Sequence, residues 1–79
     1  MKRDRFEIIA EILQVAKNGA KKTHIMYQCN LSHGQTNKFL TFLLETGFIR
    51  IGKSYDTTEK GIRFLQAYQT LELLLNTKN

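Results

Sequence analysis

The chain has 79 residues, a formal net charge of +5 and a single cysteine, Cys29. A chain of this length holds one small domain, and one thiol excludes an internal disulfide, which fits a reducing, intracellular setting. No apolar stretch approaches the roughly 18 residues needed to cross a bilayer, and the N-terminus lacks the apolar run of a signal peptide. We therefore expect no membrane partner.

The positive charge is unevenly distributed along the chain. Residues 1–22 carry +3 and residues 48–63 carry +2, whereas the other two segments balance to zero. The excess falls where a DNA-facing surface could use it, although a merely soluble basic surface explains the charge equally well. The cations Lys2, Arg3 and Arg5 either extend such a surface or only solubilise the chain end.

The first predicted helix runs from about Asp4 to Lys17. Asp4 can cap it, and apolar residues recur along it at three- and four-residue spacing. Asn18 and Gly19 end the helix, because both tolerate the left-handed conformation needed there. Residues 20–22 then form a short extended segment, which is enough for a minor strand.

Two further helices follow in close succession. Thr23 is expected to cap a short helix that reaches about Cys29, and Asn30 closes it. Ser32 is expected to cap a third helix that stops at Gly47, where glycine supplies the usual left-handed end. This pair of helices joined by a tight turn is typical of a helix-turn-helix.

The third helix has distinct inner and outer faces. At roughly 100° per residue, with Leu40 at the centre, the residues within about 60° of it are Thr36, Leu43, Leu44 and Gly47. The opposite face holds Gln35, Lys38, Phe42 and Glu45. Phe42 breaks the polar pattern of that face and needs another surface to cover it.

Two short strands and a last helix complete the chain. The strands alternate around Gly52-Lys53, with Ile49 and Ile51 on one face, and Gly52 is expected to supply the conformation of a two-residue turn. Thr57 or Thr58 then caps a helix that reaches about Asn76 and is about 28 Å long.

The last helix carries more apolar residues than one buried stripe needs. One seam at four-three-four spacing consists of Phe64, Tyr68, Leu71 and Leu75, and away from it lie Ile62, Leu65 and Leu73. An exposed leucine-rich patch is unusual on a soluble monomer. We therefore predict a homodimer whose interface consists of Phe64, Tyr68, Leu71, Leu74 and Leu75. The alternative is a wider core within one chain.

Catalysis finds little support in the sequence. His24, Cys29 and His33 lack further ligands at the spacing of a zinc site, and there is no phosphate-binding glycine loop. We predict no enzyme activity, no metal, no cofactor and no small-molecule substrate.

Helix, glycine stop and tight hairpin occur here in the order in which a winged helix presents a reading helix and a basic wing to DNA. The predicted fold is mainly α with a small β-hairpin. It comprises a winged helix-turn-helix DNA-binding domain in residues 1–57 and a C-terminal dimerisation helix in residues 58–79, together one compact unit.

Duplex DNA needs cations for its phosphates and polar side chains for its base edges. Gln35 and Asn37 have the amide groups that can pair with adenine, and Lys38 can reach phosphate or guanine. Ser32 also serves as a cap, and His33 either stabilises the turn or contacts DNA. The predicted DNA-contacting residues are Lys21, Lys22, Ser32, His33, Gln35, Asn37, Lys38, Arg50 and Lys53. An ordinary solvated surface is the alternative for each of them.

Two motifs carry a family resemblance. KTxIMYxxNLS covers residues 22–32 and TxKGxxFL covers residues 58–65, with LLETGFI between them at 43–49. In this order they resemble the small archaeal winged-helix DNA-binding proteins of the Sso-ten-a type, over nearly the whole chain. The resemblance implies a homodimer that pairs its C-terminal helices antiparallel and binds double-stranded DNA. It also implies that residues 32–38 begin the recognition helix and that Gly52-Lys53 forms the wing.

We therefore expect an intracellular, nucleoid-associated protein that binds double-stranded DNA as a homodimeric transcriptional regulator. One alternative is an architectural, chromatin-type protein with little sequence specificity. Another is a winged-helix module that binds a protein through Phe42 and the leucine-rich C-terminus.

Overall fold

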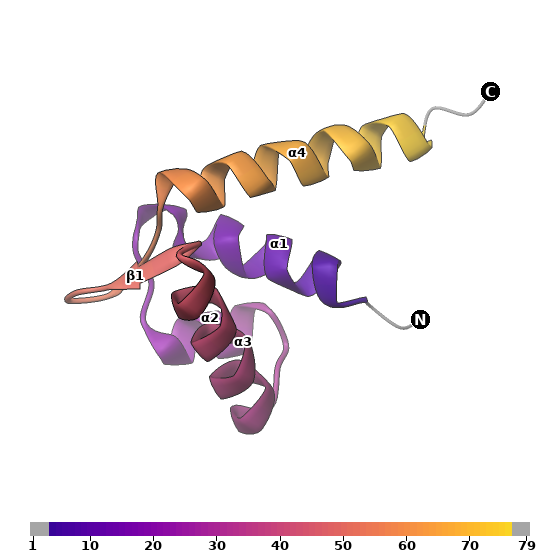
Figure 1. Ribbon diagram of the computed structural model, residues 1–79. Helices are drawn as coiled ribbons and strands as arrows, with labels where there is room; N and C mark the ends of the chain where they lie inside the picture. The colour runs from indigo at the N-terminus through magenta and orange to yellow at the C-terminus, as the bar shows by residue number, and fades with distance from the viewer. Residues whose placement is uncertain (1–3, 77–79) are drawn as a thin grey trace.

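The structure is a computed structural model that describes residues 4–76, so Lys2 and Arg3 lie outside the described residues. The elements in chain order are α1 (Arg5–Val15), a 3-10 turn (Ala16–Asn18), α2 (Lys22–Gln28), α3 (His33–Thr46), β1 (Ile49–Ile51), β2 (Tyr55–Thr57) and α4 (Glu59–Asn76). Figure 1 shows α1 in the middle, α4 on one side of it, and α2 and α3 on the other. The predicted class, mainly α with a small antiparallel hairpin, is confirmed.

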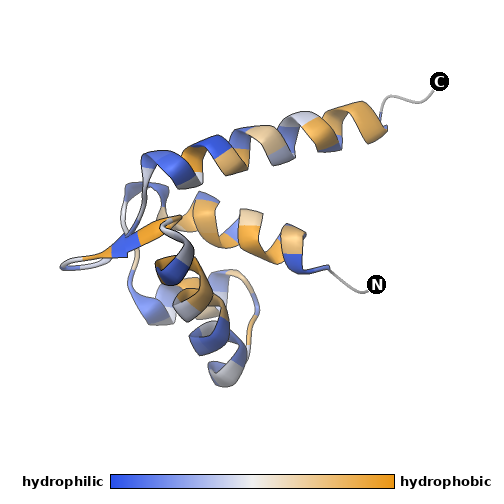
Figure 2. Ribbon diagram, in the orientation of Figure 1, coloured by the Kyte–Doolittle hydropathy of each residue, from blue (hydrophilic) through white to orange (hydrophobic). Residues whose placement is uncertain are grey.

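Helix α1 supplies the centre of the hydrophobic core. It begins at Asp4, whose carboxylate accepts a hydrogen bond from the backbone N–H of Glu7 at 2.8 Å. Ile12 and Leu13 are fully buried, and Figure 2 shows the apolar residues of α1 between the other helices. The core residues contributed by the other elements are Ile25, Leu31, Leu40, Leu43, Ile49 and Leu65. Because α1 is contacted from two sides, it needs a wider apolar surface than a helix that covers a single face.

The segment between α1 and α2 differs from the prediction. The α-helix gives way to the 3-10 turn at Ala16, before Lys17. Helix α2 begins at Lys22, because the carbonyl of Lys21 already accepts the N–H of Ile25 at 3.0 Å; Thr23 therefore lies inside the helix and does not cap it. Of the predicted extended segment, Ala20 alone forms a bridge, and it pairs with Tyr55.

The predicted ends of α3 are confirmed. The hydroxyl of Ser32 accepts the N–H of Gln35 at 3.1 Å, and the side-chain oxygen of Gln35 accepts the N–H of Ser32 at 3.0 Å, which forms a capping box. At the other end, Gly47 adopts the left-handed conformation with φ of 82°. The N–H of Phe48 then bonds the carbonyl of Leu43 at 3.0 Å, so the last turn is closed by the backbone.

The inner face of α3 is rotated from its predicted centre. Thr36, Leu40 and Leu43 are buried as predicted, and the Thr36 hydroxyl donates to the carbonyl of Ser32 at 2.8 Å. Leu44, however, is 36% exposed, so its predicted burial is wrong. Half-buried Phe39 lies on the other flank, which moves the centre of the buried face toward Leu43 and leaves Leu44 about 90° away from it.

The hairpin has a longer loop than predicted. Ile49 pairs with Thr57 and Ile51 with Tyr55, which leaves residues 52–54 as a three-residue loop. Gly52 has no positive φ, so the predicted two-residue turn is wrong. Ile49 is buried, but Ile51 on the same face is 56% exposed, because the hairpin projects beyond the body of the protein (Figure 1).

The start of α4 is tied to the end of α3. The Thr58 hydroxyl caps α4 by accepting the N–H of Gly61 at 3.1 Å, and it donates to the carbonyl of Gly47 at 2.6 Å. The ammonium of Lys60 donates to the carbonyl of Thr46 at 2.7 Å and lies over the ring of Phe48. These bonds fix the angle at which α4 leaves the domain.

Candidate nucleic-acid interface

The turn between α2 and α3 fixes the reading helix on the domain. Asn30 adopts a left-handed conformation with φ of 57°, and the N–H of Leu31 donates to the carbonyl of Met26 at 2.9 Å. The Leu31 side chain is buried in the core. In Figure 1, α2 and α3 lie on the side of α1 opposite α4, and the hairpin projects to the left between the two sides.

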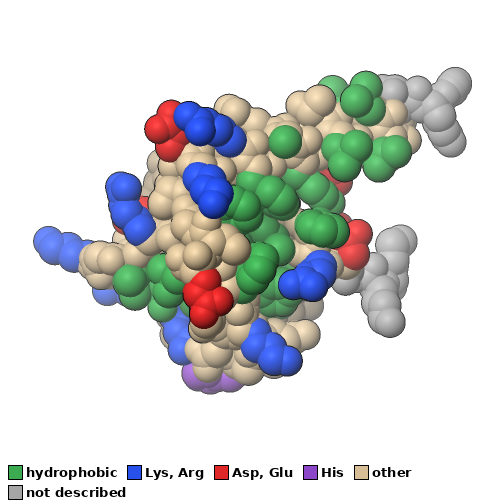
Figure 3. Space-filling model, viewed as in Figure 1, with side chains coloured by type: hydrophobic (Ala, Val, Ile, Leu, Met, Phe, Trp, Pro, Cys, Tyr) green, Lys and Arg blue, Asp and Glu red, His purple; other side chains and the backbone are tan. Residues whose placement is uncertain are grey.

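The predicted DNA-contacting residues are almost all accessible. Lys22 is half-buried, and the exposed residues are Lys21, Ser32, His33, Gln35, Asn37, Lys38, Arg50 and Lys53. They form three groups, at the start of α2, in the first two turns of α3 and on the hairpin. Figure 3 shows Lys and Arg side chains at the hairpin and along the lower edge of the domain, near the histidines.

The capping box changes the chemistry available to Gln35. Pairing with adenine uses the oxygen and the amino group of the side-chain amide together. The Gln35 oxygen already accepts the N–H of Ser32, so only its amino group stays uncommitted within the capping box. Asn37 and Lys38, which follow on the exposed surface of α3, are therefore better placed to read bases.

Gly34 is a residue of this surface that the sequence-based prediction missed. It lies in the first turn of α3, and a Cβ added there would meet nothing within 4 Å. On the helix its position lies between those of Asn37 and Lys38, about 60° from the first and about 40° from the second. A glycine lowers helix stability, and no contact at this position requires one. A glycine within the predicted helix was therefore the signal in the sequence that could have pointed to this position.

The hairpin contributes two cations, one of which faces an acid across the strands. Lys53 lies in the exposed loop, whereas Arg50 pairs in register with Asp56 across the hairpin. Opposite charges at facing positions of a hairpin attract each other. We therefore regard Lys53 as the stronger candidate for a phosphate contact.

The predicted dimer surface divides into a covered part and an exposed part. Phe64 and Tyr68 are half-buried against their own chain, and the Phe64 ring lies 5.1 Å from that of Phe48. Leu71 and the three leucines that end α4 are 54% to 70% exposed. Leu65, which the prediction set away from the seam, instead fills the core at 3% exposure.

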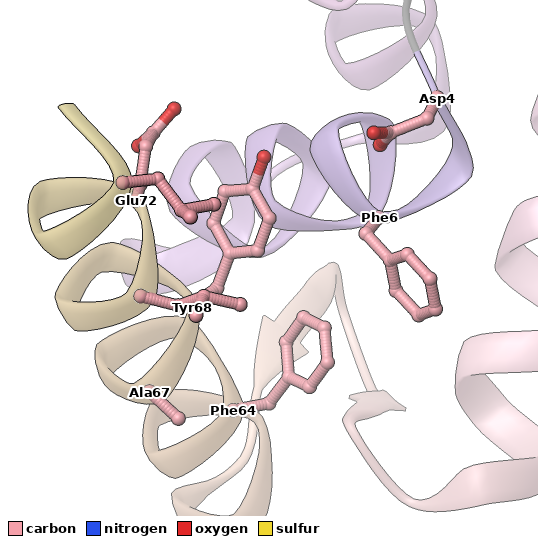
Figure 4. A pocket seen from close by; sticks show the side chains of 8 residues that line it. Asp4, Phe6, Phe64, Ala67, Tyr68 and Glu72 are labelled. Atoms are coloured by element: carbon pink, nitrogen blue, oxygen red, sulfur yellow. The ribbon is translucent and has the colours of Figure 1, made fainter.

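A groove runs between the start of α1 and the end of α4. It has a volume of about 410 Å³ and is lined by Asp4, Phe6, Phe64, Ala67, Tyr68, Leu71, Glu72 and Leu75. Figure 4 shows the Phe6 and Phe64 rings directed into it from the two helices. Desolvation raises the pKa of the Tyr68 hydroxyl, and the nearby carboxylates, Glu72 first, raise it further. The groove is therefore apolar with an acidic rim.

These features define a winged helix-turn-helix protein, and comparison with known proteins agrees. The sequence profile of the winged helix-turn-helix family matches residues 2–76. The chain belongs to this family, which is typically a non-enzymatic DNA-binding domain.

Two relatives come from Methanocaldococcus jannaschii. One, called uncharacterized protein MJ0287, is 38% identical over 79 residues, which is 98% of this chain and 81% of the relative. The other, called uncharacterized protein MJ0290, is 38% identical over 77 residues, which is 95% of this chain and only 36% of that longer protein. These relatives are archaeal, as the resemblance implied; the narrower Sso-ten-a type stays a prediction.

Two features are absent from the part of the chain that the structure describes. Between residues 4 and 76, no helix is both long enough and apolar enough to cross a membrane. In the same part of the chain, no group of three His, Cys, Asp or Glu side chains is arranged to hold a metal ion.

Proposed function

We propose that this chain is a homodimeric double-stranded DNA-binding protein that regulates transcription in the nucleoid. The observation that carries the proposal is the exposed polar start of α3, combined with a lysine-tipped hairpin in a winged helix-turn-helix fold. Asn37 and Lys38 would meet base edges in the major groove, and Gly34 would let the backbone approach closely.

The remaining contacts would go to phosphates. Lys21 and Lys22 stand at the start of α2, and Lys53 stands at the tip of the hairpin. Arg50 is a weaker member of the set because Asp56 faces it. Ser32 and His33 belong to the first turn of α3, where backbone N–H groups favour an anion. These contacts would make the affinity depend on salt and little on sequence.

The dimer would form through α4. In this division of the chain, residues 1–57 bind DNA and residues 58–79 form the dimer. Four leucines near the end of α4 are exposed, and a surface of this kind ordinarily marks an interface. Two copies paired through Leu71, Leu74 and Leu75 would place their reading helices about 34 Å apart, or a multiple of that distance.

Duplex binding is tested by measuring affinity across a salt series. Lys53→Gln should lower the slope of log affinity against log salt by about 0.9 for each protomer, or about 1.8 for the homodimer, and Lys38→Gln should weaken binding through the loss of a base contact. Arg63→Gln is the matched control, because Arg63 is an exposed cation on α4 that is ion-paired with Glu59 at 3.3 Å and belongs to none of the three groups of predicted DNA-contacting residues. No duplex binding at low salt would refute the proposal.

Selection of bound duplexes from a random pool then distinguishes two roles. A clear consensus sequence supports a regulator, whereas strong binding without a consensus indicates an architectural protein. A partner protein that binds Lys38→Gln and Lys53→Gln as well as wild type would instead favour the interaction module.

Dimerisation is tested by light scattering. The chain has a mass of 9.2 kDa, and the proposal predicts twice that mass at micromolar concentration. Leu74→Asp should give the monomer, whereas Gln66→Asp, on the side of α4 about 140° from Leu71, should not. A wild-type monomer would contradict the dimer while leaving DNA binding untouched.

A further inference from the structure

Phe42 lies close to the start of α1. The side chain lies on the outer face of α3 and is 36% exposed, which the helix itself does not explain. The guanidinium carbon of Arg5, the first residue of α1, lies 5.7 Å from the centre of the Phe42 ring. At this distance the cation is attracted to the face of the ring. The ring therefore holds in place a side chain that otherwise has many rotamers.

A second cation shares this place. Within the described chain, a small hollow of about 150 Å³ between α1 and α3 is lined by Arg5, Lys38, Phe39 and Phe42. In Figure 3, Lys and Arg side chains border the hydrophobic surface between these two helices. The neighbouring carboxylate of Asp4 is engaged in capping α1. Two cations that line one hollow, one of them lying over an aromatic ring, favour the binding of an anion there.

The position of Lys38 connects this hollow to the reading surface. On α3, Lys38 lies about 40° from Gly34 on one side and about 40° from Phe42 on the other. A duplex that approaches the Gly34–Asn37 surface would bring its flanking phosphates to the Phe42 side. An Arg guanidinium presents several N–H groups in a planar fork that matches phosphate oxygens.

We infer that Arg5, positioned by Phe42, is a phosphate-binding residue that brings α1 into the DNA interface beside Lys38. The inference rests on the proposed function and adds to it an element outside the helix-turn-helix and the wing. It also gives Phe42 a role: the ring is a positioning residue for Arg5. Because the ring restricts the guanidinium before binding, less side-chain freedom is lost when a phosphate is bound.

The experiment measures the affinity of the full chain for a duplex of about 20 base pairs, two helical turns, over a salt series. The variants are Arg5→Gln, Phe42→Leu, the double variant, and Arg63→Gln as the control of equal charge change. Arg5→Gln should lower the salt slope by about 0.9 for each protomer, or about 1.8 for the homodimer, and Arg63→Gln should leave it unchanged. Phe42→Leu, which keeps the Arg5 charge, should weaken binding less, and the double variant should bind as Arg5→Gln does.

The outcomes separate this inference from the proposed function. If wild type binds duplex and Arg5→Gln has the salt slope of Arg63→Gln, Arg5 binds no phosphate. If the losses from Arg5→Gln and Phe42→Leu add in the double variant, Phe42 does not act through Arg5. If wild type itself does not bind, the proposed function fails too. Arg5→Gln changes only an exposed side chain, so it decides the phosphate claim even if Phe42→Leu folds poorly.

Discussion

Replacing Gly61 with alanine should destabilise the protein, whereas the same replacement at Gly34 should stabilise it. Both glycines lie in the first turn of a helix, Gly61 in α4 and Gly34 in α3. They differ in their surroundings. A Cβ at Gly61 would clash with the carbonyl oxygen of Phe48 and lie 2.7 Å from the Cγ2 of Thr57. A Cβ at Gly34 would meet nothing within 4 Å.

The size of the effect follows from what must move. The Phe48 carbonyl is backbone and also accepts the N–H of Thr58 at 3.0 Å, so relief requires α4 to shift. Overpacking costs about 2 kcal/mol, and weakening the Thr58 cap costs about 1 kcal/mol more. The better helix propensity of alanine returns about 1 kcal/mol. The net loss is therefore about 2 kcal/mol at Gly61, against a gain of about 0.5 kcal/mol at Gly34.

Thermal unfolding followed by circular dichroism measures both variants. For a domain of this size, 1 kcal/mol shifts the midpoint by about 4–8 °C, so Gly61→Ala should lower the midpoint by roughly 8–16 °C. Gly34→Ala should raise it by a few degrees. A Gly61→Ala midpoint equal to that of wild type would refute the close packing of α4 on the residue before β1. If Gly34→Ala weakens duplex binding while raising the midpoint, Gly34 serves the interface and not the fold.

Two further predictions concern α3 and the groove. Ser32→Ala should lower the free energy of unfolding by about 1 kcal/mol, because it removes the capping box; chemical denaturation measures the loss, and an unchanged midpoint would contradict the cap. The Tyr68 phenol should titrate above its ordinary pKa of 10.0, and the spectroscopic titration should lose this component in Tyr68→Phe. Because folding raises this pKa, the neutral phenol of Tyr68 contributes to the free energy of unfolding. The contribution is fully present below the ordinary pKa, and it is lost as the pH rises through the pKa of the folded state.

Local chemistry made the helix ends predictable. Asp4 and Ser32 cap the starts of their helices and Gly47 caps the end of α3. All three do so through hydrogen bonds and backbone conformations that involve residues three to five positions away. Such short-range patterns are visible in the sequence. The Gly52 turn was not predictable in the same way, because the register of the hairpin is also held by the bridge between Ala20 and Tyr55.

The error on the inner face of α3 has a tertiary origin. The rotation of the helix depends on which neighbours cover it, so the exposure of Leu44 could not be read from periodicity. The contact of the Phe42 ring with the guanidinium of Arg5 joins residues that are far apart in sequence. At the candidate site, the residue types were predictable from the sequence. The engagement of Gln35 in a capping box and the open space at Gly34 were not.

The hydrogen bonds from Thr58 and Lys60 to the carbonyls of Gly47 and Thr46 connect the start of α4 to the end of α3. Helix α4 has 18 residues, which makes it a lever about 27 Å long. Through these bonds, a displacement of its leucine-rich end would also turn the end of α3. The orientation of the leucine-rich end of α4 is thus coupled to the orientation of α3.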